Sequence, residues 1–336
     1  MMENLTLTML AAVEDELRQV AGRAQGSGVE EMHQMLAYHL GWEGEGSGRA
    51  ARGKRIRPLL LLLVCAAAGG DWRKALPGAA AVELVHNFSL IHDDIQDNSP
   101  LRRGRPTVWK KWGIPQAINA GDAMFALAQL AMVDLEKTTS PATALKAVQI
   151  LNETCLQLTQ GQYLDMHYEA RGDLSLDAYW PMVSGKTAAL LSACTHIGAL
   201  AAGAEPGTIA AYRQFGRALG LAFQAEDDLL GMWGEPALTG KSSESDLVQG
   251  KKTLPVLYGL SQGGSFAQRW AKGPFQENEA LRWAEQLTQE GAREFTQEHA
   301  ARLTQQALQA LDDARPQGEA GEKLRELANQ LLNRKA

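Results

Sequence analysis

The chain has 336 residues, of which 45% are hydrophobic and 21% are charged, and its formal net charge is −6. This composition is typical of a globular protein. A general nucleic-acid binder needs a basic footprint, so the net negative charge argues against that class of partner. The cysteines, Cys65, Cys155 and Cys194, are odd in number and far apart. Their spacing argues against a disulfide framework or a structural zinc site and favours a reducing, cytoplasmic compartment.

Helical spacing of apolar residues recurs along most of the chain, and alternation of β-branched residues is almost absent. The longest apolar run, residues 59–68, is shorter than the roughly 20 residues that a membrane span needs. It therefore predicts a buried helix and no membrane span. Glycine and proline separate the helical segments, and residues 41–48 (GWEGEGSG) are expected to form a flexible loop. We predict an all-α protein with a single large helical domain over residues 1–336.

The first candidate motif along the chain is the basic segment GKRIRP (53–58). Lys54 and Arg57 are three residues apart, which would place them on one side of a helix start, and Pro58 marks that boundary. Solvated surface cations are the simpler interpretation of either residue alone. The helix predicted over residues 82–92 (VELVHNFSLIH) lacks a broad polar stripe, which is typical of helices inside a bundle.

Three aspartates follow that helix directly, in DDIQD. If the helix continues, Asp93 and Asp97 lie one turn apart on one face. Two bare carboxylates there repel each other unless a cation joins them, and negative charge at a helix C-terminus opposes the helix dipole. Magnesium prefers oxygen ligands and commonly binds one or two carboxylates together with substrate phosphates. The pair therefore favours a magnesium site over a solvated helix end.

Arginines form a separate positive block after the aspartates, in LRRGRP (101–106). A guanidinium can bind two phosphate oxygens at once, so Arg102 and Arg103 are candidates to hold a diphosphate between themselves and the metal ions. The negative and positive blocks are thus interpreted as the two sides of one anion site.

A second acidic pair, Asp227 and Asp228 in FQAEDDLLG, follows another apolar helix. The position one turn after Asp227 is Gly231, so this face offers one carboxylate fewer than the first. Downstream, Lys241 lies in TGKSSESD and Lys251 in QGKKTLP, where loops could hold ammonium groups near a phosphate. Taken alone, each lysine is more simply a solvated surface cation.

Together these segments resemble the trans-isoprenyl diphosphate synthases, or polyprenyl synthetases. The motifs GKRIRP, LVHNFSLIHDDIQDNSPLRRGRP, GQYLD, GKTA, FQAEDD, GKSSESDL and KKTLP follow one another in the family's order over about residues 50–260. The resemblance implies an all-α bundle of the isoprenoid synthase type with a deep central cavity, usually in a homodimer. It also implies a trans-prenyltransferase that condenses isopentenyl diphosphate with an allylic diphosphate (dimethylallyl, geranyl or farnesyl).

The resemblance also implies roles for individual residues at the matching positions. A trinuclear magnesium cluster would be held by Asp93 and Asp97 on one wall of the cavity and by Asp227 on the other, supported by Asp94 and Asp228. The residues that would contact the allylic diphosphate are Arg102, Lys186, Thr187, Gln224, Lys241 and Lys251. Those that would bind isopentenyl diphosphate are Lys54, Arg57, His86 and Arg103. Gln162 and Asp165 would line the cavity near the reacting carbons.

Some of these residues have simpler structural interpretations when their order in the chain is set aside. His86 could be a core histidine, Lys186 a solvated helix-start lysine, Thr187 a cap and Asp165 a surface acid. The implied chemistry is that magnesium ions and cationic side chains neutralise the departing diphosphate. The double bond of isopentenyl diphosphate then attacks the allylic carbon.

Product length is expected to depend on the helix face before Asp93. Phe88, five residues earlier, would act as a floor, whereas Ser89, four residues earlier, would leave room beside it. In the family this pattern resembles a geranylgeranyl synthase with a product of twenty carbons, and a farnesyl product is the nearer rival. Gly231 departs from the family's second motif, which weakens the expected third metal site.

Two other functions remain open from the sequence. A class I terpene synthase ionises the same diphosphate, but Lys54, Arg57 and Arg103 would have little purpose in it. A non-catalytic partner subunit should have lost carboxylates from the first cluster, yet DDIQD is whole. Only the motif DDLLG favours that second alternative.

Overall fold

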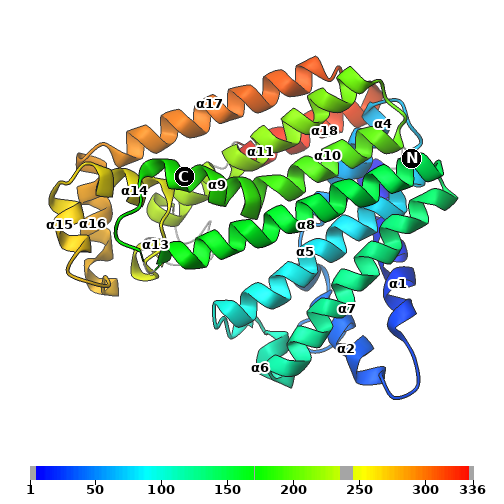
Figure 1. Cartoon of the computed structure of the whole chain (residues 1–336), viewed down its shortest axis with the longest axis horizontal. Helices are drawn as coiled ribbons and strands as arrows, with labels where there is room; N and C mark the ends of the chain where they lie inside the picture. The colour runs from blue at the N-terminus through cyan, green and yellow to red at the C-terminus, as the bar shows by residue number, and fades with distance from the viewer. Residues whose placement is uncertain (1–4, 170, 235–244, 333–336) are drawn as a thin grey trace. The chain divides into compact units, whose positions relative to one another are not determined.

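The computed structural model describes residues 5–169, 171–234 and 245–332, and helices make up nearly all of their regular structure (Figure 1). The prediction of an all-α protein is confirmed. The chain divides into two compact units. The first unit comprises Met1–Glu153, Cys194–Ile209 and Pro316–Leu324, and the second comprises Thr154–Ala193, Ala210–Arg315 and Arg325–Ala336. The expectation of a single domain over residues 1–336 stays a prediction.

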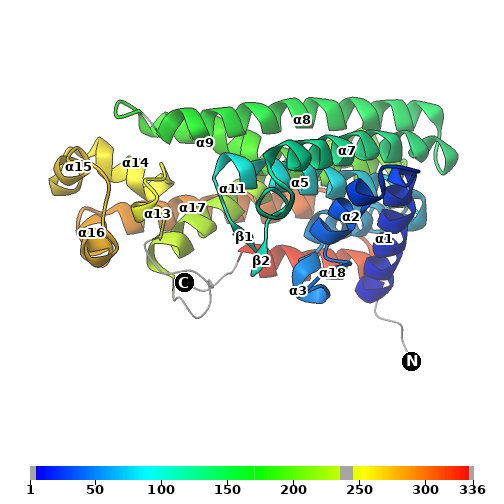
Figure 2. The same ribbon diagram turned by 90° about the horizontal axis from the view of Figure 1, so that it is seen from below.

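The first unit is built around helices α4 and α5 and the neighbours of α5. The helices that lie wholly within it are α1 (Leu5–Ala21), α2 (Glu30–His39), α3 (Arg49–Arg52), α4 (Ile56–Ala67), α5 (Leu76–Gln96), α6 (Val108–Trp112) and α7 (Ile114–Val133), and parts of four later helices also belong to it. The 3₁₀ turns η1 (Gly22–Ala24), η2 (Trp72–Ala75) and η3 (Asp134–Lys137) join some of them. α7 lies along α5 in both views (Figures 1 and 2).

The apolar run at residues 59–68 forms most of α4, and the predicted buried helix is confirmed because Leu60 to Val64 are almost inaccessible. Proline stands in the first turn of α5, where its missing N–H costs nothing. No described helix has the length and apolarity needed to cross a membrane.

A buried ion-pair network fixes the chain just before α4. Arg55 adopts a left-handed conformation (φ 47°) and donates to Glu14 Oε1 (2.7 Å), Glu83 Oε1 (2.8 Å) and the carbonyl of Leu40 (3.0 Å). Buried charges are tolerated only when paired in this way. α4 begins at Ile56, so Lys54 lies in the preceding loop. The expected placement of Lys54 on one helix face with Arg57 is therefore wrong.

The arginine-rich segment forms a short antiparallel hairpin of β1 (Leu101–Arg102) and β2 (Arg105–Pro106). Its two turn residues, Arg103 and Gly104, both have positive φ, at 51° and 74°. A two-residue hairpin turn of this kind suits the twist of the strands but strains residues other than glycine or asparagine. Arg103 is therefore held in a disfavoured conformation by the fold.

The side chain of Arg105 makes several contacts with the glycine-rich segment 41–48, which is expected to be flexible. Arg105 donates to the carbonyls of Tyr38 (2.9 Å), Glu43 (2.6 Å) and Glu45 (2.9 Å). Its guanidinium also lies over the ring of Tyr38, 4.0 Å from the centroid. These bonds hold the loop against the hairpin, and the expected flexibility of residues 41–48 stays a prediction.

The second unit contains the later helices and its own apolar core. Its helices include part of α8 (Pro141–Glu169), α9 (Tyr179–Val183), the π-helical turn η5 (Ser184–Ala188), parts of α10 (Ala189–Ala201) and α11 (Pro206–Trp233), α13 (Ser245–Val248), α14 (Leu254–Ser261), α15 (Ser265–Trp270), α16 (Glu277–Gln289), α17 (Ala292–Asp313) and part of α18 (Gly318–Leu332), with η4 (Leu176–Ala178) before α9. Phe266, Phe275 and Leu287 belong to a buried cluster where α14, α15 and α16 gather at one end of α17 (Figures 1 and 2).

Candidate functional site

The first acidic cluster lies at the C-terminal end of α5. The amide of Asp97 donates to the carbonyl of Asp93 at 2.8 Å, so the helical turn continues to the cap. The two carboxylates are therefore one turn apart on one face, as predicted. Asp93 is half-buried and Asp97 is exposed. This is an arrangement of oxygen donors that a hard divalent cation could share with a phosphate.

Asp94 has a different role from its two neighbours. It is buried, and both of its oxygens accept from Arg102 Nε at 2.9 Å, with a further contact of 2.7 Å from Arg102 Nη2. Burial raises the pKa of Asp94, and the Arg102 guanidinium opposes that rise. Asp94 therefore ties the hairpin to the end of α5.

Arg103 brings the hairpin to the GKRIRP segment. Its Nη1 donates to the carbonyl of Ala51 at 2.7 Å, and its guanidinium lies against Gly53. Nearby, Arg57 Nη1 and His86 Nε2 are 3.2 Å apart. Two predicted motifs that are distant in sequence thus contribute cations to one region of the first unit.

These cations strongly affect the histidines near them. Burial and the charges of Arg57, Arg103 and Arg102 hold the pKa of His86 well below its ordinary value. Burial, followed by Arg102 and Arg103, lowers the pKa of His39 to about 3. The Nε of Arg57 is buried and has no hydrogen-bond partner among the described residues. A concentration of positive charge of this kind, with an unsatisfied donor, suits a bound anion.

The second acidic pair divides its roles in the same way. Asp227 is exposed, whereas Asp228 is buried. Asp228 Oδ2 accepts from the Tyr179 hydroxyl (2.8 Å) and the Leu254 amide (2.9 Å), and Oδ1 accepts from Gln224 Nε2 (2.9 Å). Burial raises the pKa of Asp228 to about 7 despite these three donors. Asp228 is thus a structural support that joins α11 to α9 and α14.

Position 231, where the sequence lacks a carboxylate, is adjacent to one from another segment. A Cβ placed on Gly231 would lie 2.3 Å from Asp246 Oδ2. Asp246 belongs to α13 and to the GKSSESDL motif, and its charge also raises the pKa of Asp228. The sequence pattern of this motif does not by itself indicate a role for Asp246. The second cluster therefore contains a carboxylate beside the position of Gly231.

Lys186 and Thr187 lie in the π-helical turn η5. Lys186 forms an ion pair with Asp165 of α8, and the Thr187 hydroxyl donates to Gln224 Oε1 at 2.7 Å. Since Gln224 also bonds Asp228, the turn is connected to the second acidic pair. π-helical turns inside helices are frequent at functional sites. The structure thus brings Asp165, Lys186, Thr187 and Gln224 together.

Glycines allow the π-helical turn to approach its neighbours closely. A Cβ on Gly161 of α8 would lie 2.2 Å from the Lys186 backbone nitrogen, and one on Gly185 would lie 2.5 Å from the Gln157 carbonyl oxygen. On the other side, a Cβ on Gly220 of α11 would lie 2.5 Å from Ala188 Cα. Only glycine permits these backbone contacts, so the three glycines fix the position of Lys186 and Thr187.

The remaining predicted residues are placed as follows. Lys251 is half-buried, and its amide donates to the carbonyl of Asp246 at 3.0 Å. Lys241 lies outside the described residues. Phe88 of α5 is half-buried and meets Phe125 edge-on at 5.2 Å between centroids, while the Ser89 hydroxyl donates to the His86 carbonyl at 2.8 Å.

The described side chains do not form a metal site by themselves. Among the described residues, no three His, Cys, Asp or Glu side chains gather as a metal cage. Aspartate pairs such as Asp93 and Asp97 suit magnesium instead, because that ion usually keeps waters and substrate phosphates among its ligands.

Replacing Gly161 by alanine is expected to destabilise the second unit by about 2 kcal/mol, because the new Cβ overlaps backbone atoms of the π-helical turn. Gly207→Ala is the matched control, since Gly207 is also helical and a Cβ there meets nothing within 4 Å. The free energy of unfolding of the control should rise by up to about 1 kcal/mol. Urea unfolding measures both changes, and equal effects of the two substitutions would contradict the proposed close contact.

Known proteins resemble this chain over most of its length. The Polyprenyl synthetase family profile matches residues 48–286. The (2E,6E)-farnesyl diphosphate synthase of Mycobacterium tuberculosis H37Rv is 40% identical over 331 residues, which are 95% of this chain and 90% of that protein. The geranylgeranyl diphosphate synthase of the same organism is 45% identical over 254 residues, 75% of this chain and 72% of that one.

Solved structures agree with the sequence comparison. A polyprenyl synthetase from Streptomyces coelicolor A3(2) has a TM-score of 0.86 and 37% identity, covering 97% of this chain and 98% of that one. The expected isoprenoid synthase fold is thereby confirmed. The chain belongs to the polyprenyl synthetase family of trans-prenyltransferases.

Proposed function

We propose that this enzyme condenses isopentenyl diphosphate with an allylic diphosphate to give a short-chain all-trans prenyl diphosphate, with geranylgeranyl diphosphate as the product. The observation that carries this proposal is that the first unit offers two kinds of group suited to a diphosphate, one of them through a bound cation. One is the Asp93 and Asp97 pair, which suits magnesium and a diphosphate. The other is the pair of cations Arg57 and Arg103 beside His86, which suits a second diphosphate.

The second group of cations favours a condensing enzyme over a terpene synthase. A terpene synthase ionises one diphosphate substrate, so a second anion site would serve no purpose in it. Here Arg57 keeps a buried, unsatisfied Nε, and Arg103 is held in a strained backbone conformation beside Gly53. Strain of this kind persists where function needs it. The non-catalytic alternative is disfavoured because the first acidic pair is intact.

Each residue has a proposed part in the reaction. Asp93, Asp97 and Asp227 would hold magnesium, which when bound neutralises the charge of the departing diphosphate. Arg102, Lys186, Thr187, Gln224, Lys241 and Lys251 are proposed to orient the allylic diphosphate. Its C–O bond breaks, and the electron pair leaves with the diphosphate. The double bond of isopentenyl diphosphate then forms the new C–C bond, and a proton is lost.

Asp246 is proposed as an additional carboxylate of the second cluster. Its oxygen lies where a side chain on residue 231 would extend, which would lessen the effect of the missing third aspartate. Together with Asp227 it would supply oxygen donors for magnesium.

Two further properties are proposed from surface features. A homodimer is supported by exposed apolar residues on α8, where Leu156 and Tyr163 are each more than 60% exposed and lie two turns apart on one face. A cytoplasmic location is supported by the free, buried cysteines at 65, 155 and 194.

The direct test supplies labelled isopentenyl diphosphate and magnesium with dimethylallyl, geranyl or farnesyl diphosphate, and identifies the product chains. Asp93→Asn should lower prenyl transfer at least about a hundredfold, because it removes a charged ligand at the reacting diphosphate. Asp15→Asn, an exposed aspartate on α1, is the control and should retain activity. Wild-type protein that released no diphosphate with any starter would refute the proposed function.

Asp246→Ala should raise the magnesium concentration needed for half-maximal activity about tenfold, since one carboxylate leaves the second cluster. Adding Gly231→Asp to that variant should recover part of the loss, because the new carboxylate enters the vacated space. A magnesium dependence equal to that of wild type in Asp246→Ala would exclude Asp246 from metal binding.

Phe88→Ala should lengthen the product by one or more five-carbon units, because Phe88 is proposed as the floor that stops the growing chain. Leu7→Ala, which truncates an exposed residue on α1, is the control. Mass spectrometry of the products measures the shift. An unchanged chain-length distribution in Phe88→Ala would remove this residue from the account of product length.

A further inference from the structure

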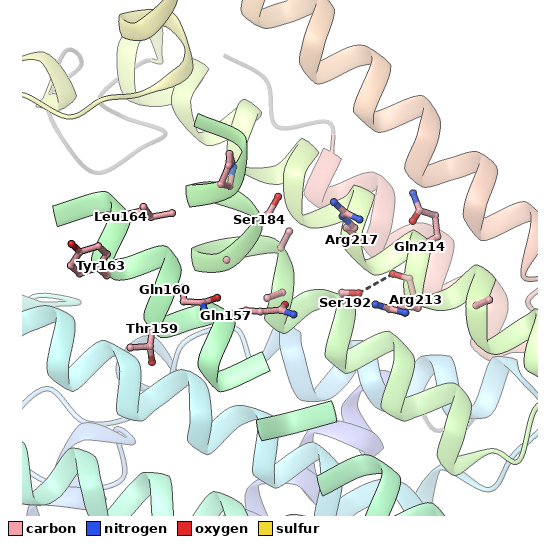
Figure 3. Close-up of a pocket in the computed structure, with 15 residues that line it drawn as sticks. Gln157, Thr159, Gln160, Tyr163, Leu164, Ser184, Ser192, Arg213, Gln214 and Arg217 are labelled. Carbon is pink, nitrogen blue, oxygen red and sulfur yellow. Dashed lines mark hydrogen bonds between the residues drawn. The ribbon is translucent and has the colours of Figure 1, made fainter. Parts of the chain in front are cut away.

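A pocket of about 980 Å³ lies within the second unit, on α8, α9, η5, α10 and α11 (Figure 3). This volume is at the upper end of the range for small-molecule sites. The pocket does not include any of the residues assigned above to substrates or metals. Its lining is partly apolar, with Leu164, Pro181, Ala188 and Ala189, and partly polar, with glutamine and serine side chains.

The charge of the pocket is opposite to that of the chain. Its lining includes Arg213 and Arg217 and none of the chain's acidic residues, although the chain carries 39 Asp and Glu against 33 Lys and Arg. The two arginines are one turn apart on α11, and both are exposed. Among the described residues neither guanidinium forms an ion pair, so both can bind an anion.

The π-helical turn forms part of the pocket's lining. Ser184, Gly185 and Ala188 line the pocket, while Lys186 and Thr187 of the same turn bond Asp165 and Gln224. The dashed bond in Figure 3, from the Ser192 hydroxyl to the Arg213 carbonyl at 3.0 Å, fixes α10 beside α11. A ligand in this pocket would therefore press on the segment that carries two proposed substrate contacts.

We propose that this pocket is an effector site for an amphipathic anion, with a phosphate, sulfonate or carboxylate head on Arg213 and Arg217 and an apolar body against Leu164 and Ala188. Its coupling to the π-helical turn rests on the proposed function of Lys186 and Thr187. The binding itself does not, because it needs only the pocket. The chemistry of the site combines two forked guanidiniums with an apolar wall, which a purely hydrophobic or purely polar ligand would use only in part.

The binding test uses two fluorescent probes with the same ring system, one charged and one neutral. Anilinonaphthalene sulfonate should bind the wild-type protein, and its Kd should rise at least about tenfold in Arg213→Gln/Arg217→Gln, because charge-assisted hydrogen bonds to the sulfonate are lost. The Kd of phenylnaphthylamine, which lacks the sulfonate, should change less than about twofold in the same variant. Arg302→Gln removes an exposed arginine of α17 outside the pocket and serves as the control.

Two results would overturn the proposed site. One is an unchanged Kd for the sulfonate probe in the double variant, and the other is an equal loss for both probes. Circular dichroism checks that the variants are folded. Coupling is tested by repeating the wild-type titration with saturating inorganic pyrophosphate and magnesium, which should change the Kd of the sulfonate probe by the reciprocity of linked sites. An unaltered Kd would refute coupling. A protein that makes no prenyl product could still pass the binding test, so failure of the proposed function is distinguishable.

Discussion

The geometry of the first unit's site depends on the ion pair between Asp94 and Arg102. Successive helical residues point about 100° apart, so turning Asp94 inward fixes where Asp93 and Asp97 point. The same pair holds the hairpin, and through it Arg103 lies beside Gly53. A buried pair of this kind is weak evidence of stability. Its evident effect here is to hold the hairpin against the end of α5, while Asp93 and Asp97 point away from this pair.

The positive block is held in a state that favours anion binding. Burial, together with the positive charges nearby, lowers the pKa values of His39 and His86, and partial desolvation lowers the pKa values of Arg57 and Arg103. Like charges gathered in this way repel one another, and an anion bound beside them would offset that repulsion. The buried aspartate of the second unit differs from this positive block. Asp228 accepts hydrogen bonds from Tyr179, Gln224 and Leu254, so its carboxylate is already satisfied within the protein.

Sequence reasoning succeeded where the information is local or repeated. Apolar periodicity predicted the helices, and the spacing of Asp93 and Asp97 predicted their shared face. It failed where the deciding contact comes from a distant segment. The two-residue strands of the hairpin are too short for an alternating pattern, and Arg105 fastens residues 41–48 through carbonyl groups that no composition reveals. Nothing in the sequence around His39 indicates that this residue lies near Arg102 and Arg103. Asp246 stood in a recognised motif, but its place beside Gly231 appears only in three dimensions.

The hairpin at residues 101–106 has a consequence for how this segment can vary in length. Surface turns usually accept inserted or deleted residues at little cost. Here the two-residue turn sets the register, and a shift of one residue would move each side chain to the opposite face. Arg102, Arg103 and Arg105 have separate partners on Asp94, Ala51 and the 41–48 segment. A single added residue would therefore break all three attachments together, so related chains should tolerate substitution here far better than a change in length.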